Sequence, residues 1–174
     1  MTSLADISTS SIPGPPQRQH YGLTFAALAL SAATFAVLQS LVAPALPEIQ
    51  RELHASATSV TWVLTAYLLS ASVLTPIVGR LGDMFGKERT LVISLAVLGA
   101  GTLLAALATN VTVLIAARLI QGCGGAIFPL AFGIIRDEFP RERVATGIAM
   151  ISAILGIGAG LGIVLAGPIV ETLS

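Results

Sequence analysis

Two long runs without a charged residue flank a short turn that is rich in charge, and this pattern constrains the fold most strongly. Neither Ala55–Val78 nor Leu91–Ala117 contains Asp, Glu, Lys or Arg. The turn Gly79–Leu91 between them holds three basic and two acidic side chains, namely Arg80, Asp83, Lys87, Glu88 and Arg89. Because about 20 apolar residues cross the hydrocarbon core of a bilayer, the pattern predicts a hairpin of two membrane-spanning helices.

The composition agrees with a membrane protein. Of the 174 residues, 55% are hydrophobic and only 10% are charged, with a mean hydropathy of +0.89. Such a chain has too few polar residues to cover a water-soluble globule, so the lipid bilayer is its expected partner. Its single cysteine, Cys123, excludes an intramolecular disulfide framework and a thiolate metal cluster.

The first twenty residues differ from the rest. Met1–His20 is polar and rich in Ser and Pro, so it is predicted to be a disordered tail. It is not a signal peptide, because Asp6 is the only charged residue before Arg18 and the apolar run that follows is too long.

Polar breaks divide the remainder into five predicted spans. Tyr21–Pro47 has no charged residue; Pro44 and Pro47 weaken the helix near its outer end, and Glu48–His54 is predicted to be an outer loop. Trp62 is placed to anchor the second span at the outer interface. The predicted spans are residues 21–46, 57–78, 90–109, 111–135 and 144–168.

The third and fourth spans are separated by an argument from length. Thr90–Ile135 holds a single charged residue, Arg118. As one helix, at about 1.5 Å per residue, it would be about twice as long as the hydrocarbon core, which is about 30 Å thick. It must turn once, and Thr109–Asn110 is the polar break near its middle.

The basic residues predict the orientation. If the N-terminus is inside, Arg51 is the one cation of the outer segments. The inner segments then hold seven, namely Arg18, Arg80, Lys87, Arg89, Arg136, Arg141 and Arg143. Because Lys and Arg favour the cytoplasmic side of a bilayer, the N-terminus is predicted to be cytoplasmic and the protein to lie in the plasma membrane.

The charged turn also carries a sequence signature. Its glycines allow a sharp turn and close approach of two helix ends, and Asp83 is placed to face a helix N-terminus. The plain alternative is a charged loop that only sets topology. The turn resembles the motif Gly-x-Leu-x-Asp-Arg-x-Gly-Arg-Lys/Arg-Arg of the major facilitator superfamily, except at Met84 and Glu88. The resemblance implies a role in the conformational switch for Gly79, Asp83, Gly86, Lys87 and Arg89.

A second signature lies in the fourth span. Arg118–Ala126 resembles the motif Arg-x-x-x-Gly-x-Gly of the same family, in the form with Gln before the first Gly that is common among drug:proton antiporters. The resemblance makes Arg118, with Gln121 and Gly122, a candidate for proton coupling or for lining the cavity. A charge within a span is by default a functional candidate. The alternative is that Arg118 extends its side chain to the outer interface.

The fifth span places small residues at repeated four-residue spacings. This spacing lets a neighbouring helix pack closely, and helix packing alone would explain it. Through Gly158, Gly162 and Gly167 the span resembles the antiporter motif Gly-x-x-x-Gly-Pro-x-x-Gly-Gly, with Ile163 in place of the Pro and Ala166 in place of a Gly.

The first two spans resemble the fourteen-helix drug:proton antiporter branch. Ala45-Leu46-Pro47 and Trp62–Leu69 match it, but Leu38 stands where an Asp is frequent, and Gln39 is a polar cavity candidate nearby. No predicted span contains Asp or Glu, so a proton-accepting carboxylate must lie elsewhere or be replaced by an arrangement centred on Arg118.

Together these observations predict an all-α membrane protein whose five helices form an incomplete N-terminal six-helix bundle of a major facilitator fold. The resemblance implies a part of a longer secondary transporter that exports drugs or metabolites, is inactive alone, and has protons and a small-molecule substrate as partners. Residues 171–174 are read as a truncated end, and the missing C-terminal half as a further partner. The alternative is a small non-transporting membrane protein that assembles through its glycine-rich fifth helix. No catalytic motif, cofactor or metal site, or nucleic-acid surface is expected.

Overall fold

The computed structural model describes residues 21–173, so the predicted tail Met1–His20 lies outside the described residues. Over this range it is helical, with no strand. Five segments are long and apolar enough to cross a membrane, which confirms the predicted number of spans. The elements are α1 (Tyr21–Glu52), α2 (Ala57–Phe85), α3 (Lys87–Ala106), α4 (Val111–Gln121), the 3₁₀-helix η1 (Gly122–Ala126), α5 (Ile127–Glu138) and α6 (Arg141–Leu173).

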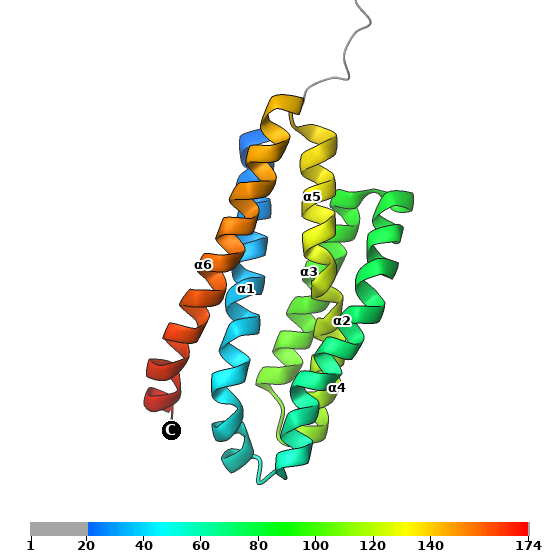
Figure 1. The fold of residues 1–174 in the computed structure, drawn as a ribbon. Helices are drawn as coiled ribbons and strands as arrows, with labels where there is room; N and C mark the ends of the chain where they lie inside the picture. The colour runs from blue at the N-terminus through cyan, green and yellow to red at the C-terminus, as the bar shows by residue number, and fades with distance from the viewer. Residues whose placement is uncertain (1–20, 174) are drawn as a thin grey trace, which may run out of the picture.

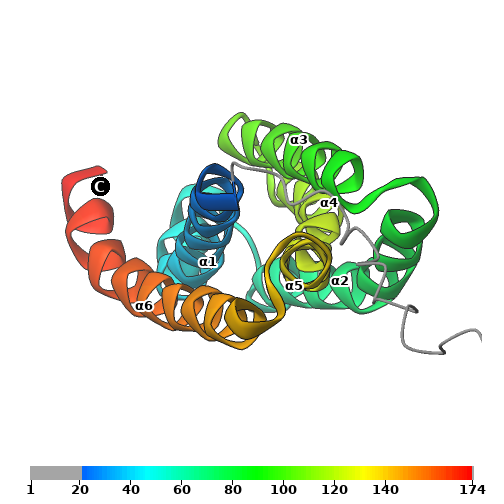
Figure 2. The same cartoon turned by 90° about the horizontal axis from the view of Figure 1, so that it is seen from above.

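The helices lie lengthwise in one bundle (Figure 1). Seen from above, α1 and α6 form a pair on one side, and α2, α3, α4 and α5 form a group on the other (Figure 2). In this group α2 packs along α4 and η1, and α3 packs against α4 and α5. The segments α4, η1 and α5 follow one another without a loop and form one span.

The apolar core is centred on η1 and α5. Ile127, Leu130 and Ile135 are fully buried there and meet buried side chains from α1, α3 and α6. By contrast, many large apolar side chains point outward; Leu30 and Val164 are each 70% exposed. An apolar surface of this extent is suited to lipid and not to water. The chain is therefore a multi-pass membrane protein.

Both charged turns are shorter than predicted. α2 continues to Phe85, and Gly86 alone separates it from α3, with a φ of 101° that favours glycine. Arg80 and Asp83 are thus helical residues at the end of α2 and not loop residues. In the second charged turn, predicted at residues 136–143, only residues 139–140 separate α5 from α6. One or two residues suffice to reverse the chain, and polar side chains at the helix ends still reach water.

The predicted outer loop Glu48–His54 is wrong over most of its length, because α1 continues to Glu52. Pro44 and Pro47 lie inside this helix without ending it. An ion pair between Arg51 and Glu48, with 2.8 Å between Nη1 and Oε2, joins two side chains one turn apart in the added segment. The link to α2 is residues 53–56.

The turn in the middle of the predicted third and fourth spans lies at residues 107–110, where Thr109–Asn110 was expected. Asn110 caps α4, since its Oδ1 accepts a hydrogen bond of 3.0 Å from the backbone N–H of Val113. The sequence did not indicate the 3₁₀ segment η1 within the fourth span.

Candidate functional site

The candidate site is built around Arg118, whose side chain is only 3% exposed. Its Nε donates to the carbonyl oxygen of Val63 on α2 at 3.3 Å. One terminal nitrogen donates to Gln121 Oε1 at 2.6 Å, and the other to Gln39 Oε1 on α1 at 2.9 Å. The guanidinium therefore joins α1, α2 and α4 inside the bundle. The alternative, in which the Arg118 side chain extends to the outer interface, is therefore not observed.

Two further residues complete the cluster. The guanidinium carbon of Arg118 lies 4.5 Å from the ring centre of Tyr67, in a cation–π contact. Gln121 Nε2 donates to Thr102 Oγ1 at 3.1 Å, which in turn donates to the carbonyl of Leu98 on α3 at 2.8 Å. We call Arg118, Gln39, Gln121, Tyr67 and Thr102 the arginine cluster.

The arginine cluster holds a positive charge without a negative partner. Within residues 21–173, no ion pair joins Arg118 to a carboxylate, whereas the ion pairs Arg51–Glu48 and Lys87–Asp137 lie near helix ends. Neutral dipoles and an aromatic face are what stabilise the cation. A charge desolvated in this way is a strong attractant for an anionic or polar group that enters the bundle.

A cavity of about 280 Å³ lies beside the arginine cluster. Gln39, Arg118 and Gln121 line it with polar groups, while the remaining lining is mostly aliphatic, including Val42 and Leu114. A mostly apolar cavity with a few convergent polar groups is the usual form of a small-molecule site.

Gly122, a predicted cavity residue, has a packing role instead. A Cβ at this position would meet the side chain of Ser70 and would lie 2.8 Å from the backbone nitrogen of Ala71. The hydroxyl of Ser70 donates to the carbonyl of Leu119, which ties α2 to α4. Gly122 thus allows the close contact of α2 with the start of η1.

Lys87, at the first charged turn, contacts Asp137, at the second charged turn. Lys87 Nζ lies 2.7 Å from Asp137 Oδ2 at the end of α5 and 3.4 Å from Asp83 Oδ1. The lysine stem passes over Gly133, where a Cβ would lie 2.7 Å from the lysine Cδ and Cε. We call Lys87, Asp83 and Asp137 the lysine cluster. Asp137 is a partner that sequence reasoning missed, although its place in the second charged turn was the available signal.

The other predicted switch residues have fewer contacts. A Cβ at Gly79 would meet nothing within 4 Å, and Arg89 is exposed. Gly86 supplies the positive φ of the turn. Gly82, one of the glycines expected to allow close approach but not one of the predicted switch residues, is buried, and a Cβ there would meet Cδ2 of Leu130.

Two of the three predicted packing glycines of α6 contact α1. A Cβ at Gly158 would lie 2.9 Å from the Cβ of Ala36, and one at Gly162 would meet Ser40. Gly167 makes no such contact among the described residues, because none of their atoms lies within 4 Å of its Cβ position. Ala166, at the four-residue spacing after Gly162, is buried instead. Gly158 and Gly162 thus pack against α1 of the same chain.

Comparison with known proteins identifies relatives. Residues 28–174 match the family model described as Major Facilitator Superfamily. The chain is 39% identical over 154 residues to an "MFS-type transporter" of Aspergillus terreus, covering 87% of this chain and 28% of that protein. It is 37% identical over 150 residues to "Efflux pump dotC" of Dothistroma septosporum, covering 84% and 26%. It is 32% identical over 149 residues to the "Tetracenomycin C resistance and export protein" of Streptomyces glaucescens, covering 85% and 28%. The chain thus spans about a quarter of the length of these curated relatives.

Proposed function

The chain belongs to the major facilitator superfamily, and we propose that its five-helix bundle takes part in the secondary active export of small molecules. Relatives named as an efflux pump and as an export protein support the outward direction. We propose no catalytic role for the bundle. We further propose that it lies in the plasma membrane with its N-terminus in the cytoplasm, on the basis of the seven cations assigned to the inner segments.

The arginine cluster is the observation that carries this proposal. Arg118 presents a buried positive charge beside an apolar cavity and has no carboxylate partner among the described residues. We propose that a substrate, or a group elsewhere in the transporter whose protonation changes, competes with Gln39 and Gln121 for hydrogen bonds from the guanidinium. This exchange would link occupation of the cavity to rearrangement of α1, α2 and α4.

Transporters of this kind work by rocking two helical bundles around a central site. Because the chain spans about a quarter of the length of its relatives, we propose that these residues act within a longer transporter and do not transport alone.

The test compares Arg118→Ala and Arg118→Lys in the full transporter, reconstituted in vesicles with an imposed pH gradient and a fluorescent anionic dye as substrate. Arg118→Ala should lower dye transport at least about tenfold, because a hydrogen bond to a charged group contributes about 1.5–3 kcal/mol. Arg118→Lys keeps the charge but lacks the planar fork that reaches both glutamines, so it should recover only part of the transport. Arg136→Gln removes an exposed cation of the same span and is the matched control.

Vesicles that hold only residues 1–174 are the second control, and proton-driven export by them would contradict the proposed need for a longer transporter. Unchanged coupled transport by both Arg118 variants would refute the proposed role of the arginine cluster.

Orientation is tested separately with single cysteines placed at Arg89 and Arg141, after Cys123 is replaced by Ser. A membrane-impermeant maleimide should label both positions only after the cells are opened, because both are proposed to be cytoplasmic. Labelling of one position in intact cells would overturn the proposed topology.

A further inference from the structure

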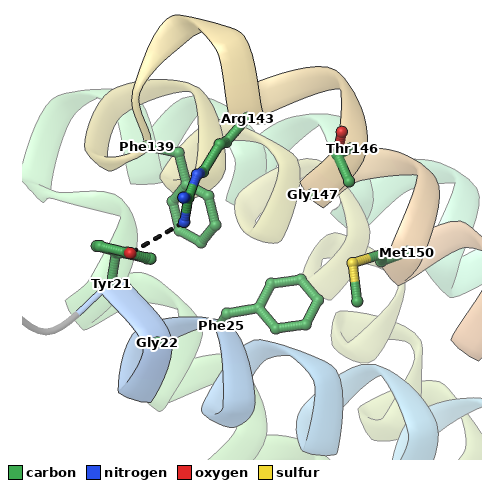
Figure 3. Close-up of a pocket in the computed structure, with 8 residues that line it drawn as sticks. All are labelled: Tyr21, Gly22, Phe25, Phe139, Arg143, Thr146, Gly147 and Met150. Atoms are coloured by element: carbon green, nitrogen blue, oxygen red, sulfur yellow. Dashed lines mark hydrogen bonds between the residues drawn. The ribbon is translucent and has the colours of Figure 1, made fainter.

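A second cleft, unrelated to the arginine cluster, lies between the first turns of α1 and α6 (Figure 3). Its volume is about 450 Å³. Tyr21 and Phe25 line it from α1, Arg143 and Met150 line it from α6, and Phe139 lines it from the link that precedes α6. We call it the α1–α6 cleft. None of these residues was selected as a site residue from the sequence, apart from the use of Arg143 as a cation that sets orientation.

Arg143 gives one end of the α1–α6 cleft a positive charge. Its Nη1 donates to the hydroxyl of Tyr21 at 2.9 Å, and its guanidinium carbon lies 5.4 Å from the centre of the Tyr21 ring. Within the described residues it forms no ion pair. A guanidinium carries five N–H donors, and this hydrogen bond uses one of them. The others are available to an anionic group that accepts two parallel hydrogen bonds.

The tyrosine that holds Arg143 is itself fixed. Its ring packs edge-on against Phe139, with 6.0 Å between ring centres, and Phe139 also contacts Phe25 at 6.1 Å. Arg143 is thus held beside the cleft by a supported aromatic group and not left as a freely rotating surface side chain.

The other end of the α1–α6 cleft is apolar. Phe25 and Met150 face it from opposite helices (Figure 3), and Met150 is 48% exposed. A ligand that fits this surface carries an anionic group at one end and a hydrocarbon portion at the other. A helix end beside an aromatic group and a cation is also where the boundary between headgroups and acyl chains is expected.

We propose that the α1–α6 cleft binds one anionic phospholipid of the inner leaflet, with its phosphate on Arg143 and an acyl chain along Phe25 and Met150. Basic pockets between membrane helices on the cytoplasmic side bind anionic headgroups for the same electrostatic reason. The tail Met1–His20 is a poorer occupant, because Asp6 and Arg18 give it no net charge to complement Arg143. This inference rests on the proposed orientation and does not depend on transport.

The experiment measures lipid retained by the full chain, purified in a mild detergent, by native mass spectrometry with equal concentrations of phosphatidylglycerol and phosphatidylcholine. The wild type should retain phosphatidylglycerol preferentially. Arg143→Gln should lower its retention about fivefold, the effect expected for one cation near an anionic lipid. Arg141→Gln is the matched control, because it removes an exposed cation two residues away that does not line the cleft.

Two further variants keep the test decisive if Arg143→Gln does not fold. Thr146→Trp retains Arg143 but fills the cleft from an exposed lining position, so it should also lower phosphatidylglycerol retention. Arg143→Lys should retain more phosphatidylglycerol than Arg143→Gln, because it keeps the charge.

Four results would each overturn the proposal. The first is equal retention of the two lipids by the wild type, and the second is an equal loss in Arg141→Gln and Arg143→Gln. The third is displacement of the lipid by inorganic phosphate at the same concentration, which would indicate a site for free anions. The fourth is a several-fold gain in retention on removal of residues 1–20, which would assign the cleft to the tail. A negative result for Arg118 in the transport test would leave this outcome unaffected.

Discussion

The bundle holds two of its cations by opposite means. Arg118 is 3% exposed and is surrounded by amide oxygens, a carbonyl and an aromatic ring, with no carboxylate among the contacts that the structure describes. Lys87 is one-quarter exposed and has two carboxylates, at 2.7 and 3.4 Å. The interior charge is thus stabilised by buried dipoles, and the charge at the helix end by carboxylates that are exposed to solvent.

Because of this difference in burial, the arginine cluster and the lysine cluster are expected to contribute differently to stability. Removing a dipole from the arginine cluster leaves a buried cation without a partner, and the desolvation penalty then appears in full. Removing a carboxylate from the lysine cluster leaves groups that water can solvate, so little stability is lost. The arginine cluster is therefore expected to govern stability and coupling. The lysine cluster is the one that we propose breaks and re-forms during a conformational change.

The largest expected effect is that of Gln121→Leu. It removes the acceptor 2.6 Å from Arg118 and the donor to Thr102, while keeping a side chain of similar size. The free energy of unfolding should fall by about 1.5–3 kcal/mol, the range for hydrogen bonds to charged groups. Reversible unfolding in mixed micelles, followed by circular dichroism, measures the change. Gln50→Leu, near the C-terminal end of α1, is the control and should have a much smaller effect.

If Gln121→Leu and Gln50→Leu change stability equally, Arg118 does not depend on its dipoles, and the contrast between the two clusters fails.

A smaller effect is expected in the lysine cluster. A double-mutant cycle with Lys87→Met and Asp137→Asn should give a coupling of about 0.2–1 kcal/mol, as for partly exposed ion pairs. The same unfolding measurement gives the coupling, which should decrease when salt is added because solvated charges are screened. A salt-independent coupling above that range would show that the lysine cluster is also desolvated.

The matching cycle with Asp83→Asn should give the smallest value, below about 0.5 kcal/mol, because this pair spans the turn at Gly86 with the longer distance of 3.4 Å and the more exposed carboxylate. A coupling larger than that of Asp137 would make Asp83 the principal partner and would reverse the order within the cluster.

Features that depend on local sequence were predictable. The number of spans follows from runs of uncharged residues, and the turn capped by Asn110 follows from the length of residues 90–135. Arg118 was a candidate because a charge within a span is costly. Its inward direction was not decided by the sequence, since extension to the outer interface was left open as an alternative.

Features that depend on contacts between distant segments were missed. Lys87 and Asp137 are fifty residues apart, and Tyr21 and Arg143 are 122 apart. No periodicity in one helix indicates which side chain of another helix lies opposite. In α6, the four-residue spacing includes Gly158 and Gly162, which contact α1, and Ala166, which is buried, whereas the motif pointed to Gly167.

The segment η1 has a consequence for the span that contains it. A 3₁₀-helix has about 3.0 residues per turn and an α-helix about 3.6, so each residue turns about 20° further about the axis. Over the five residues of Gly122–Ala126, α5 is rotated about the axis of the span by up to roughly 100° relative to a continuous α-helix. Overwinding by about a quarter turn sets which side of α5 faces Lys87 when Arg118 faces Gln39. If these five residues adopted α-helical geometry, α4 and α5 would rotate relative to each other about the axis of the span.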